Sequence, residues 1–361
     1  MSCVLAVATA LPGPPHDQRA ITEVVAPIVA GDDERTARLL RRVHRNSGVR
    51  TRHLALAPAQ YAAVRDFGHA NDLYLALGTD LAERAARDAL ARAGVGAEEV
   101  DFVLLTSVTG IGAPSVDAAL ADRLGMRHDV KRLPSFGLGC AGGAAGLARV
   151  HDYLVGHPHD TALLVCLELC SLTLQHADDD PAALVASGLF GDGAAAAVVT
   201  GREHPAARDA AGPAVVGTRS HLYPGTSEAL GWRIGSSGFR IVLSADLPDV
   251  VRAQVAGDVE DLLAAHGLKP GDVARWVVHA GGPRILDAVE DALALPAGSL
   301  DASRASLAAV GNLSSASVLD VLARTTDATP PPPAGSPGVL LAFGPGVSAE
   351  MVLLQWSPTE G

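Results

Sequence analysis

The stretch LPSFGLGCAGGAAGLARVHDYLVG, residues 133–156, decides the fold, and Cys140 lies at its centre. After the cysteine, a run of glycine and alanine passes into apolar residues at helical spacing, which predicts that the thiol lies where a helix begins. Unpaired N–H groups and the helix dipole lower the pKa of a thiol at such a position. We therefore expect a reactive thiolate at Cys140, while a buried structural cysteine in a glycine-rich helix is the alternative that this stretch leaves open.

The composition restricts the class of protein. The chain has 361 residues, of which 48% are hydrophobic and 19% are charged, so it can bury a large core. Its net charge of −12 argues against a general nucleic-acid binder, which needs a basic face. The N-terminus lacks a basic leader, no apolar run approaches the ~18 residues that cross a bilayer, and four cysteines form no disulfide framework in so long a chain. We expect a cytoplasmic protein.

Basic residues nevertheless cluster near the N-terminus. Seven arginines lie between residues 35 and 52, in a predicted helical segment and the loop that follows it. A solvated helix face and a mouth that receives a small polyanion both explain such a cluster, and this segment alone does not separate the two.

The order of predicted elements recurs along the chain. The first part contains a strand at the N-terminus, a helical segment at residues 17–45, a helix at 71–93, a strand at 101–105, the Cys140 helix, and strands at 161–169 and 194–200. After a change of composition at residues 201–213, there follow a helix at 250–266, a strand at 276–279, a helix at 284–295, another helix near Asn312 and two final strands. This recurrence predicts a duplication, with halves at residues 1–205 and 206–361. Two such halves make an α/β protein, a layered α/β/α/β/α sandwich whose loops meet at one central site.

Three residues fall at equivalent loops or helix starts of the two halves: Cys140, His279 and Asn312. His279 ends a strand and precedes Ala-Gly-Gly-Pro, so its imidazole is expected in the crevice between the halves. Asn312 lies at a helix entry, where a helix-capping asparagine is the alternative explanation. Taken together, the three residues are a more specific signal of a catalytic site than any one of them alone.

Five motifs resemble those of one family. They are GLGCAGGA around Cys140, HAGGP from His279, GNLSSA around Asn312, LFGDGA from residue 189 and AFGPG at residues 342–346. In this order, over nearly the whole chain, they resemble the type III polyketide synthases of the chalcone synthase superfamily. Within that family the chain is most similar to bacterial enzymes that make alkylpyrones, germicidin-like pyrones or alkylresorcinols. The resemblance implies a thiolase-like fold and a homodimer.

The resemblance also implies a reaction. Cys140 would accept an acyl group from a CoA thioester, its thiolate held by the helix start and by a charged His279. His279 and Asn312 would stabilise the enolate that forms when malonyl-CoA or an alkylmalonyl-CoA loses carbon dioxide. The enolate would lengthen the acyl chain, and cyclisation would give a pyrone or a resorcinol-type product. No metal, flavin or nicotinamide cofactor is implied.

Family positions around the pocket differ from those of the plant enzymes. Phe190 matches one gatekeeper phenylalanine between the CoA tunnel and the cavity, but the second gatekeeper is Ile241 here. Other positions that match the substrate cavity are Thr173, Ser314 and Cys170, and Ala113 replaces a methionine that reaches across the dimer. Fewer aromatic walls favour an aliphatic acyl starter.

The arginine cluster gains a role from the resemblance. Arg42 matches a family position that contacts the phosphates of CoA, and Arg41 and Arg45 are expected to assist it. Two family lysines are replaced by Asn46 and Leu39, so the contacts with the phosphates must differ in detail.

Other functions remain as alternatives. An initiating ketoacyl-carrier-protein synthase would use a similar Cys-His-Asn set, although the Gly-Asp-Gly and Gly-Pro-Gly stretches argue against it. A degradative thiolase needs a second catalytic cysteine, and an inactive thiolase-fold scaffold would not need all three residues. Cys166 and Cys170 are not expected to bind a metal. Glu168 and Asp192 are predicted to be structural hydrogen-bond partners, and a role of Glu168 in orienting water or the cyclising chain is the alternative.

Overall fold

The centre of the fold is a mixed nine-stranded sheet. The computed structural model describes residues 1–176, 178–208, 210 and 212–356. The strands follow the order β11-β12-β13-β8-β1-β7-β6-β4-β5 across the sheet. Their bounds are β1 (Ser2–Ala10), β4 (Phe102–Ser107), β5 (Lys131–Phe136), β6 (Thr161–Leu169), β7 (Asp192–Gly201), β8 (Ala214–Leu222), β11 (Arg275–Val278), β12 (Pro337–Gly344) and β13 (Ser348–Gln355).

The sheet consists of two halves with the same topology. In the first half, β1 pairs antiparallel with β7, β7 antiparallel with β6, and β6 parallel with β4. In the second half, β8, β13, β12 and β11 repeat these pairings in the same order. The halves join through a short antiparallel pairing of β1 with β8, at Ser2↔Val215 and Cys3↔Ala214. The duplication predicted from the sequence is therefore confirmed, while a division between residues 205 and 206 stays a prediction.

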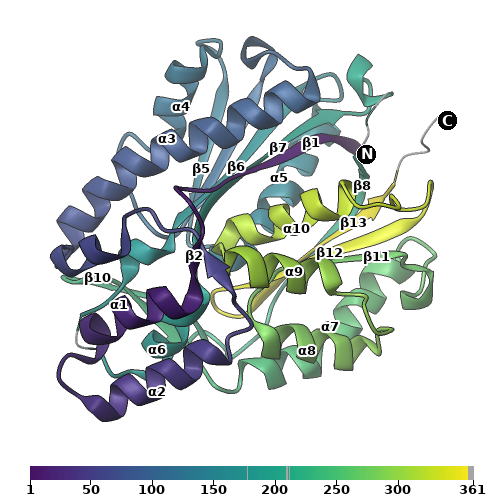
Figure 1. The fold of residues 1–361 in the computed structure, drawn as a ribbon. Helices are drawn as coiled ribbons and strands as arrows, with labels where there is room; N and C mark the ends of the chain where they lie inside the picture. Colours follow the sequence, from purple (N-terminus) through teal and green to yellow (C-terminus); the bar gives the residue numbers. More distant parts are fainter. Residues whose placement is uncertain (177, 209, 211, 357–361) are drawn as a thin grey trace.

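Helices form the other layers of the sandwich (Figure 1). Helices α5 (Gly142–Gly156) and α10 (Ser317–Thr326) lie in the middle and contact strands of both halves. Helices α3 (Phe67–Ala93) and α4 (Val116–Leu124) cover the outer face of the first half, and α7 (Leu247–Ala264) covers that of the second, packed against α8 (Pro283–Leu293). Helix α9 (Asp301–Val310) lies between α8 and α10 in the chain. The α/β/α/β/α arrangement agrees with the prediction.

The central layer requires small residues because two helices and two sets of strands meet there. At Gly143, in the first turn of α5, a Cβ atom would lie 2.3 Å from the carbonyl oxygen of Ser315. Any side chain at Gly143 would therefore push α5 away from the turn that precedes α10. The glycine and alanine run of residues 141–146 is explained by this close approach.

The strands differ in how clearly the sequence indicates them. Strand β6 is buried along its whole length, and its unbroken apolar run is typical of a strand covered on both faces. Strand β5 lies at the edge of the sheet, is mostly exposed and contains Pro134, which edge strands tolerate. Its charged and proline residues hide it from pattern analysis, and β5 was not among the predicted strands.

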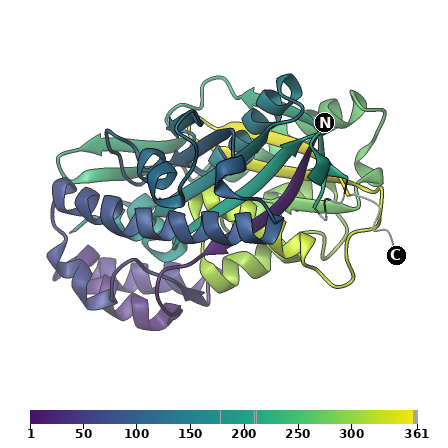
Figure 2. The ribbon, with the colours of Figure 1, turned by 90° about the horizontal axis from the view of Figure 1, so that it is seen from above.

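A group of shorter elements covers one end of the sheet. It comprises α1 (Gln18–Ala30), α2 (Glu34–Arg45), α6 (Pro181–Leu189) and the hairpin of β9 (Leu230–Gly235) with β10 (Gly238–Leu243). In both views, α1 and α2 lie at the opposite end of the molecule from the N-terminus of β1 (Figures 1 and 2). The helical segment predicted at residues 17–45 is thus two helices, which separate at Gly31 with φ +54°. Among the described residues, no helix has the length and apolarity needed to cross a membrane.

Candidate active site

Cys140 lies in a single turn of 3-10 helix, η3 (Gly139–Ala141), directly before α5. Gly139 has φ +51°, and a Cβ atom there would lie 2.5 Å from the Pro345 side chain. The turn therefore needs glycine both for its backbone angle and for its contact with the loop after β12 in the other half. The prediction that the thiol lies at the start of a helix is confirmed.

The second half contains an equivalent turn, η7 (Ser314–Ala316), directly before α10. The backbone angle φ is +49° at Ser314 and +51° at Gly139, so these two residues are equivalent. Ser315, the next residue, therefore occupies the position equivalent to Cys140. The Ser315 hydroxyl donates a hydrogen bond of 2.6 Å to Glu168 at the end of β6. Each turn therefore contacts a strand end of the opposite half, and this exchange brings the halves together at the site.

The three predicted catalytic residues line one cavity. Cys140, His279 and Asn312 share a cavity of about 340 Å³ that lies between α6, α8 and the β9–β10 hairpin. Apolar side chains supply most of the rest of its wall, among them Val185, Leu189, Leu230, Leu243, Pro248 and Phe343. A mostly apolar cavity with a few converging polar groups is typical of a small-molecule site.

His279 is a buried histidine without a partner. It follows β11, its backbone N–H donates to Leu341 O at 2.8 Å, and the residue is 3% exposed. Within the described part of the chain, neither ring nitrogen has a hydrogen-bond partner. Burial lowers the pKa of His279 to about 3. Burial thus opposes the charge expected on His279, because the imidazolium would lose its hydration with no carboxylate beside it, and the charged form stays a prediction.

The thiol of Cys140 is also more weakly acidic than the sequence predicts. The residue is partly buried and lines the cavity, and its nearest hydrogen-bond partner is the Ser314 hydroxyl at 3.8 Å. Burial raises the pKa of Cys140 to about 12, and the charge of Glu168 adds to the shift, although hydrogen bonds from Ser314 and Asn312 oppose it. The expected depression by the helix start is outweighed because desolvation of a buried thiolate costs more than one helix terminus returns. Burial thus favours the uncharged forms of both Cys140 and His279.

Asn312 is held by both its backbone and its side chain. Its backbone N–H donates to Leu189 O at 2.8 Å, and its carbonyl oxygen accepts from Gly191. Its Oδ1 accepts from the N–H of Ser314 at 2.8 Å, which caps the η7 turn. Its Nδ2 donates to Gly281 O at 3.3 Å, and the residue lines the Cys140 cavity. Asn312 thus caps a turn at the wall of the cavity.

Two buried carboxylates stand beside the site. Glu168 accepts hydrogen bonds from Val108 N, Thr109 Oγ1 and Ser315, and burial raises its pKa to about 7. Asp192 accepts from Ala55 N and from Ser171, and burial raises its pKa to about 6. Both side chains are structural hydrogen-bond partners, as the sequence predicted.

A second, smaller cavity adjoins the first. Phe190 and Ile241 line both cavities, so they form the boundary between them. The inner cavity has a volume of about 60 Å³, and Cys170 and Thr173 belong to its wall together with polar residues from several elements: Arg52, Tyr61, Ser171, Gln175 and Asp178. The predicted gatekeepers therefore separate two spaces, with Cys170 and Thr173 in the inner one. Ser314 lines neither cavity and contacts the Cys140 thiol instead.

Two family models match the chain almost from end to end. The N-terminal domain of chalcone and stilbene synthases matches residues 1–203, and the C-terminal domain matches residues 215–358. The chain belongs to the chalcone and stilbene synthase family.

Individual proteins that are similar to this chain support the same family assignment. A 1,3,6,8-tetrahydroxynaphthalene synthase of Streptomyces peucetius subsp. caesius is 56% identical over 98% of this chain and 93% of its own length. An α-pyrone synthesis polyketide synthase-like protein of Mycobacterium tuberculosis is 32% identical over 86% of this chain and 81% of its own. The crystal structure of the tetrahydroxynaphthalene synthase of Streptomyces coelicolor A3(2), a bacterial type III polyketide synthase, aligns with a TM-score of 0.92 at 32% identity, covering 99% of this chain and 100% of that one.

The protein is thus a type III polyketide synthase with the thiolase-like fold, an acyltransferase that uses CoA thioesters. Membership of this family favours a polyketide synthase that acts on CoA thioesters over the three alternatives, which were an initiating ketoacyl-carrier-protein synthase, a degradative thiolase and an inactive scaffold. Within the described residues, no group of three or more His, Cys, Asp or Glu side chains is placed to hold a metal ion.

The remaining predicted residues of this polyketide synthase lie farther out. Ala113 lines a separate space beside Tyr74 and Phe136, away from the Cys140 cavity of its own chain. Arg42 and Arg45 are exposed on α2, and Arg41 forms an ion pair of 3.3 Å with Glu23. Asn46 and Ser47, just after α2, line the mouth of the main cavity. The proposed CoA contacts of the arginines stay predictions.

Two residues of the site were not singled out by the sequence. Arg52 was counted in the arginine cluster, but nothing in its neighbours indicated that it is only 3% exposed. Ser315 could have been found by aligning GCAG of the first half with SSAS of the second, which places it opposite Cys140.

Proposed function

We propose that this polyketide synthase uses malonyl-CoA both as starter and as extender and releases 1,3,6,8-tetrahydroxynaphthalene. The observation that carries the proposal is the 56% identity, over nearly the full length of both chains, to an enzyme of that name. The inner cavity supports it, since its volume of about 60 Å³ suits a short chain better than a long alkyl chain.

The composition of the product agrees with a malonyl starter. A naphthalene skeleton corresponds to a chain of five two-carbon units, each of which carries one carbonyl oxygen. One ring closes by carbon-carbon bond formation at the thioester, which releases the thiol, and the other by an aldol reaction that loses water. Four oxygens then remain as hydroxyl groups, provided that the extra carboxylate of the starter leaves as carbon dioxide.

The common cavity of Cys140 and His279 supports a definite first step. His279 accepts the proton of Cys140 as the sulfur attacks the thioester carbonyl, and the same proton leaves with the CoA thiol. Forming the ion pair only during attack avoids holding two desolvated charges in the resting site. Cys140 then carries the starter as a thioester.

The second step uses His279 and Asn312 as donors. The thioester oxygen of the extender accepts hydrogen bonds from a protonated ring nitrogen of neutral His279 and from Asn312 Nδ2. The bond to the carboxylate breaks, carbon dioxide leaves, and the electron pair forms an enolate. The enolate carbon attacks the thioester on Cys140, and the sulfur departs. We propose no metal or redox cofactor, because decarboxylation supplies the carbanion.

The protein is further proposed to be a homodimer through the edge of the sheet. Three large apolar side chains are exposed there, Ile111 at 43%, Leu133 at 46% and Phe136 at 50%, near Ala113. Apolar exposure on an unpaired edge strand favours a partner. Sedimentation of the wild type against Leu133→Glu tests it, since the variant should sediment as a monomer.

An aliphatic starter that ends in a pyrone or a resorcinol is the second candidate. The apolar lining of the main cavity, with Leu230, Leu243 and Val185, favours it. The relative from Mycobacterium tuberculosis, whose name includes α-pyrone synthesis, is the more distant one at 32% identity.

One assay separates the candidates. The purified protein is incubated with malonyl-CoA as the only CoA ester, and in parallel with octanoyl-CoA and malonyl-CoA together, and products are identified by mass spectrometry against authentic standards. The proposal predicts tetrahydroxynaphthalene from malonyl-CoA alone. Alkylpyrones or alkylresorcinols from octanoyl-CoA, with no naphthalene from malonyl-CoA alone, would establish the second candidate instead.

A further inference from the structure

Arg52 is a buried arginine, and one nitrogen of its guanidinium group has no hydrogen-bond partner among the described residues. It lies on β3 (Thr51–Arg52) and is 3% exposed. Its Nε donates to Gln18 Oε1 at 2.9 Å, and its Nη1 donates to the carbonyl oxygen of Phe190 at 2.7 Å. Its Nη2 is buried and has no hydrogen-bond acceptor among the described residues. An unpaired guanidinium nitrogen at this depth is costly unless a ligand pairs with it.

Arg52 belongs to the wall of the inner cavity. Arg52 lines that cavity together with Cys170. Phe190, which accepts the Nη1 hydrogen bond, forms the boundary with the main cavity. A chain that grows from Cys140 past Phe190 therefore extends toward the guanidinium.

Neighbouring carboxylates do not occupy Nη2. Asp192 influences Arg52 electrostatically, but its oxygens accept hydrogen bonds from Ala55 N, Ser171 N and the Ser171 hydroxyl. Asp178, in the wall of the same cavity, pairs with Arg240 at 3.0 Å. Neither carboxylate therefore satisfies Nη2.

We propose that Arg52 Nη2 binds the starter-derived carboxylate of the growing chain in the inner cavity and keeps that carboxylate from being lost early. This inference rests on the proposed malonyl starter. A guanidinium pairs strongly with a carboxylate, and in a buried site such a charge-assisted bond is short and directional.

Retention of this carboxylate is a chemical problem for the enzyme. After the first condensation, the starter-derived carboxyl group lies β to a ketone. A β-keto acid loses carbon dioxide readily when its own proton is shared with the ketone oxygen, and the electron pair becomes an enol that collapses to a methyl ketone. Pairing with Arg52 holds the group as the anion, which lacks that proton. The same pairing keeps the carboxylate away from the His279 and Asn312 donors.

The pairing also explains a preference among starters. An acetyl or aliphatic starter places a methyl end beside the guanidinium and leaves Nη2 unpaired in a buried space. Malonyl is the starter that satisfies it. Arg52 is therefore a specificity-determining residue for the starter.

Product ratio is the test, with Arg52→Lys and Arg52→Met compared with wild type. With malonyl-CoA alone, we expect the ratio of tetrahydroxynaphthalene to methyl-ended pyrones to fall about 10- to 100-fold in Arg52→Met, the range for losing one hydrogen bond to a charged group. Arg52→Lys, which keeps a charge but not the forked geometry, should fall between. Condensation from added acetyl-CoA should persist in both, which a merely unfolded variant would not show. Arg87→Met, at an exposed arginine of α3, is the matched control and should leave the ratio unchanged.

The outcomes separate this inference from the proposed function. If the wild type makes no tetrahydroxynaphthalene from malonyl-CoA, the proposed function fails. If the wild type makes it and both Arg52 variants, folded by circular dichroism, keep the wild-type product ratio and starter preference, the role of Arg52 is overturned while the proposed function stands.

Discussion

In the first half of the fold the turn before the central helix reads Gly139-Cys140-Ala141, whereas the equivalent turn of the second half reads Ser314-Ser315-Ala316. The backbone is nearly the same in both, with φ +51° at Gly139 and +49° at Ser314. Cys140 opens onto the cavity, while Ser315 points its hydroxyl into the opposite half and binds Glu168. The two halves thus have the same backbone at this turn but different residues. Cys140 is the proposed nucleophile, whereas Ser315 forms a buried hydrogen bond that links the halves.

The largest expected effect comes from removing the nucleophile of the first half. Cys140→Ala should lower product formation from malonyl-CoA by at least about 10³-fold, because no thioester can form on the enzyme. Cys3→Ala, at a partly buried free cysteine of β1, is the control and should retain activity. Product is measured by liquid chromatography with mass spectrometry. Normal turnover by Cys140→Ala would mean that the two turns do not differ in the way described.

The second half contributes donors instead of a nucleophile. Asn312→Ala should lower the release of carbon dioxide from malonyl-CoA by about 10²- to 10³-fold, as expected for one lost donor to a developing oxyanion. Acylation of Cys140 should be less affected, since Asn312 acts on the extender. His159→Gln, at an exposed histidine, is the control. Equal losses in acylation and decarboxylation would contradict the division of roles.

The hydrogen bond between Ser315 and Glu168 should affect the stability of the fold and not the reaction. The pH dependence of the free energy of unfolding tests this, because Glu168 titrates. Its pKa is raised from 4.5 to about 7 by burial. The unfolded chain releases this proton at lower pH than the folded protein, so the stability that protonated Glu168 contributes is present below pH 4.5 and is lost as the pH rises through 7.

The full shift corresponds to about 3 kcal/mol. In Glu168→Gln this part of the pH dependence should disappear. Free energies of unfolding in urea, measured for wild type and variant at about pH 5 and about pH 8, give the difference. Parallel pH profiles for the two proteins would show that Glu168 does not titrate in this way.

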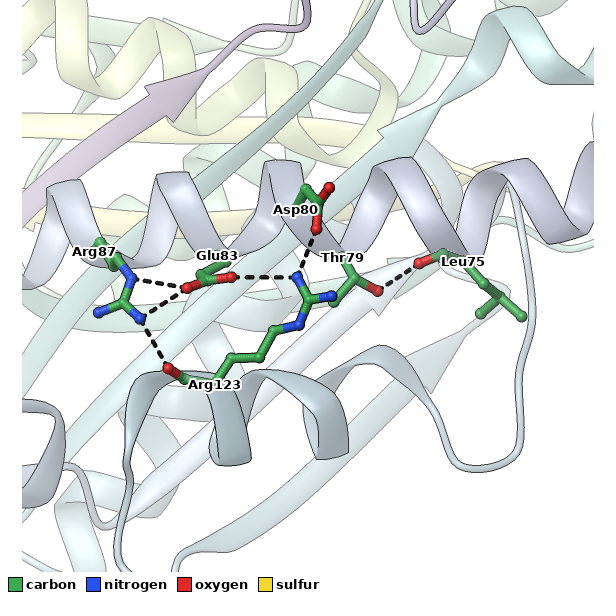
Figure 3. Close-up of polar contacts among 6 residues, drawn as sticks. All are labelled: Leu75, Thr79, Asp80, Glu83, Arg87 and Arg123. Carbon is green, nitrogen blue, oxygen red and sulfur yellow. Dashed lines mark hydrogen bonds and ion pairs between the residues drawn. The ribbon is translucent and has the colours of Figure 1, made fainter.

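The smallest effects on stability are expected in the outer layers, where exposed ion pairs join neighbouring helices in both halves. Arg123 of α4 pairs with Asp80 and Glu83 of α3, and Arg87 also contacts Glu83 (Figure 3). In the second half, Arg252 of α7 pairs with Asp249 and with Asp291 of α8. These ion pairs are exposed and screened, so Arg123→Ala and Arg252→Ala should each shift the thermal midpoint by no more than about 1–2 °C. A much larger shift for one of them would mean that the outer layers are not equivalent.

Much of the scaffold could be predicted because its signals are local. The β6 strand at residues 161–169 is an unbroken apolar run, and its predicted bounds agree with the structure. The Cys140, His279 and Asn312 motifs also came from sequence, and the structure brings all three to one cavity. Elements that are stabilised by contacts distant in the sequence were not predicted. Strand β5 forms at the edge of the sheet, and α6 and the β9–β10 hairpin form part of the wall of the cavity.

The electrostatics of the site could not be predicted because burial is a property of the packed molecule. A helix start beside Cys140 suggested a thiolate, and the lining of the cavity was needed to show that desolvation dominates. The same holds for Arg52, whose neighbours Thr51 and His53 give no sign that the side chain is enclosed. The pyrone or resorcinol product expected from the motifs stays a prediction.

The most direct test of the account is to identify the acylated residue. The protein is exposed briefly to malonyl-CoA, quenched in acid and digested, and the peptides that contain Cys3, Cys140, Cys166 and Cys170 are compared by mass spectrometry. The account predicts an acyl group on the Cys140 peptide alone, and none in Cys140→Ala. An acyl group on any other cysteine, or an unmodified Cys140 in an enzyme that turns over, would contradict it.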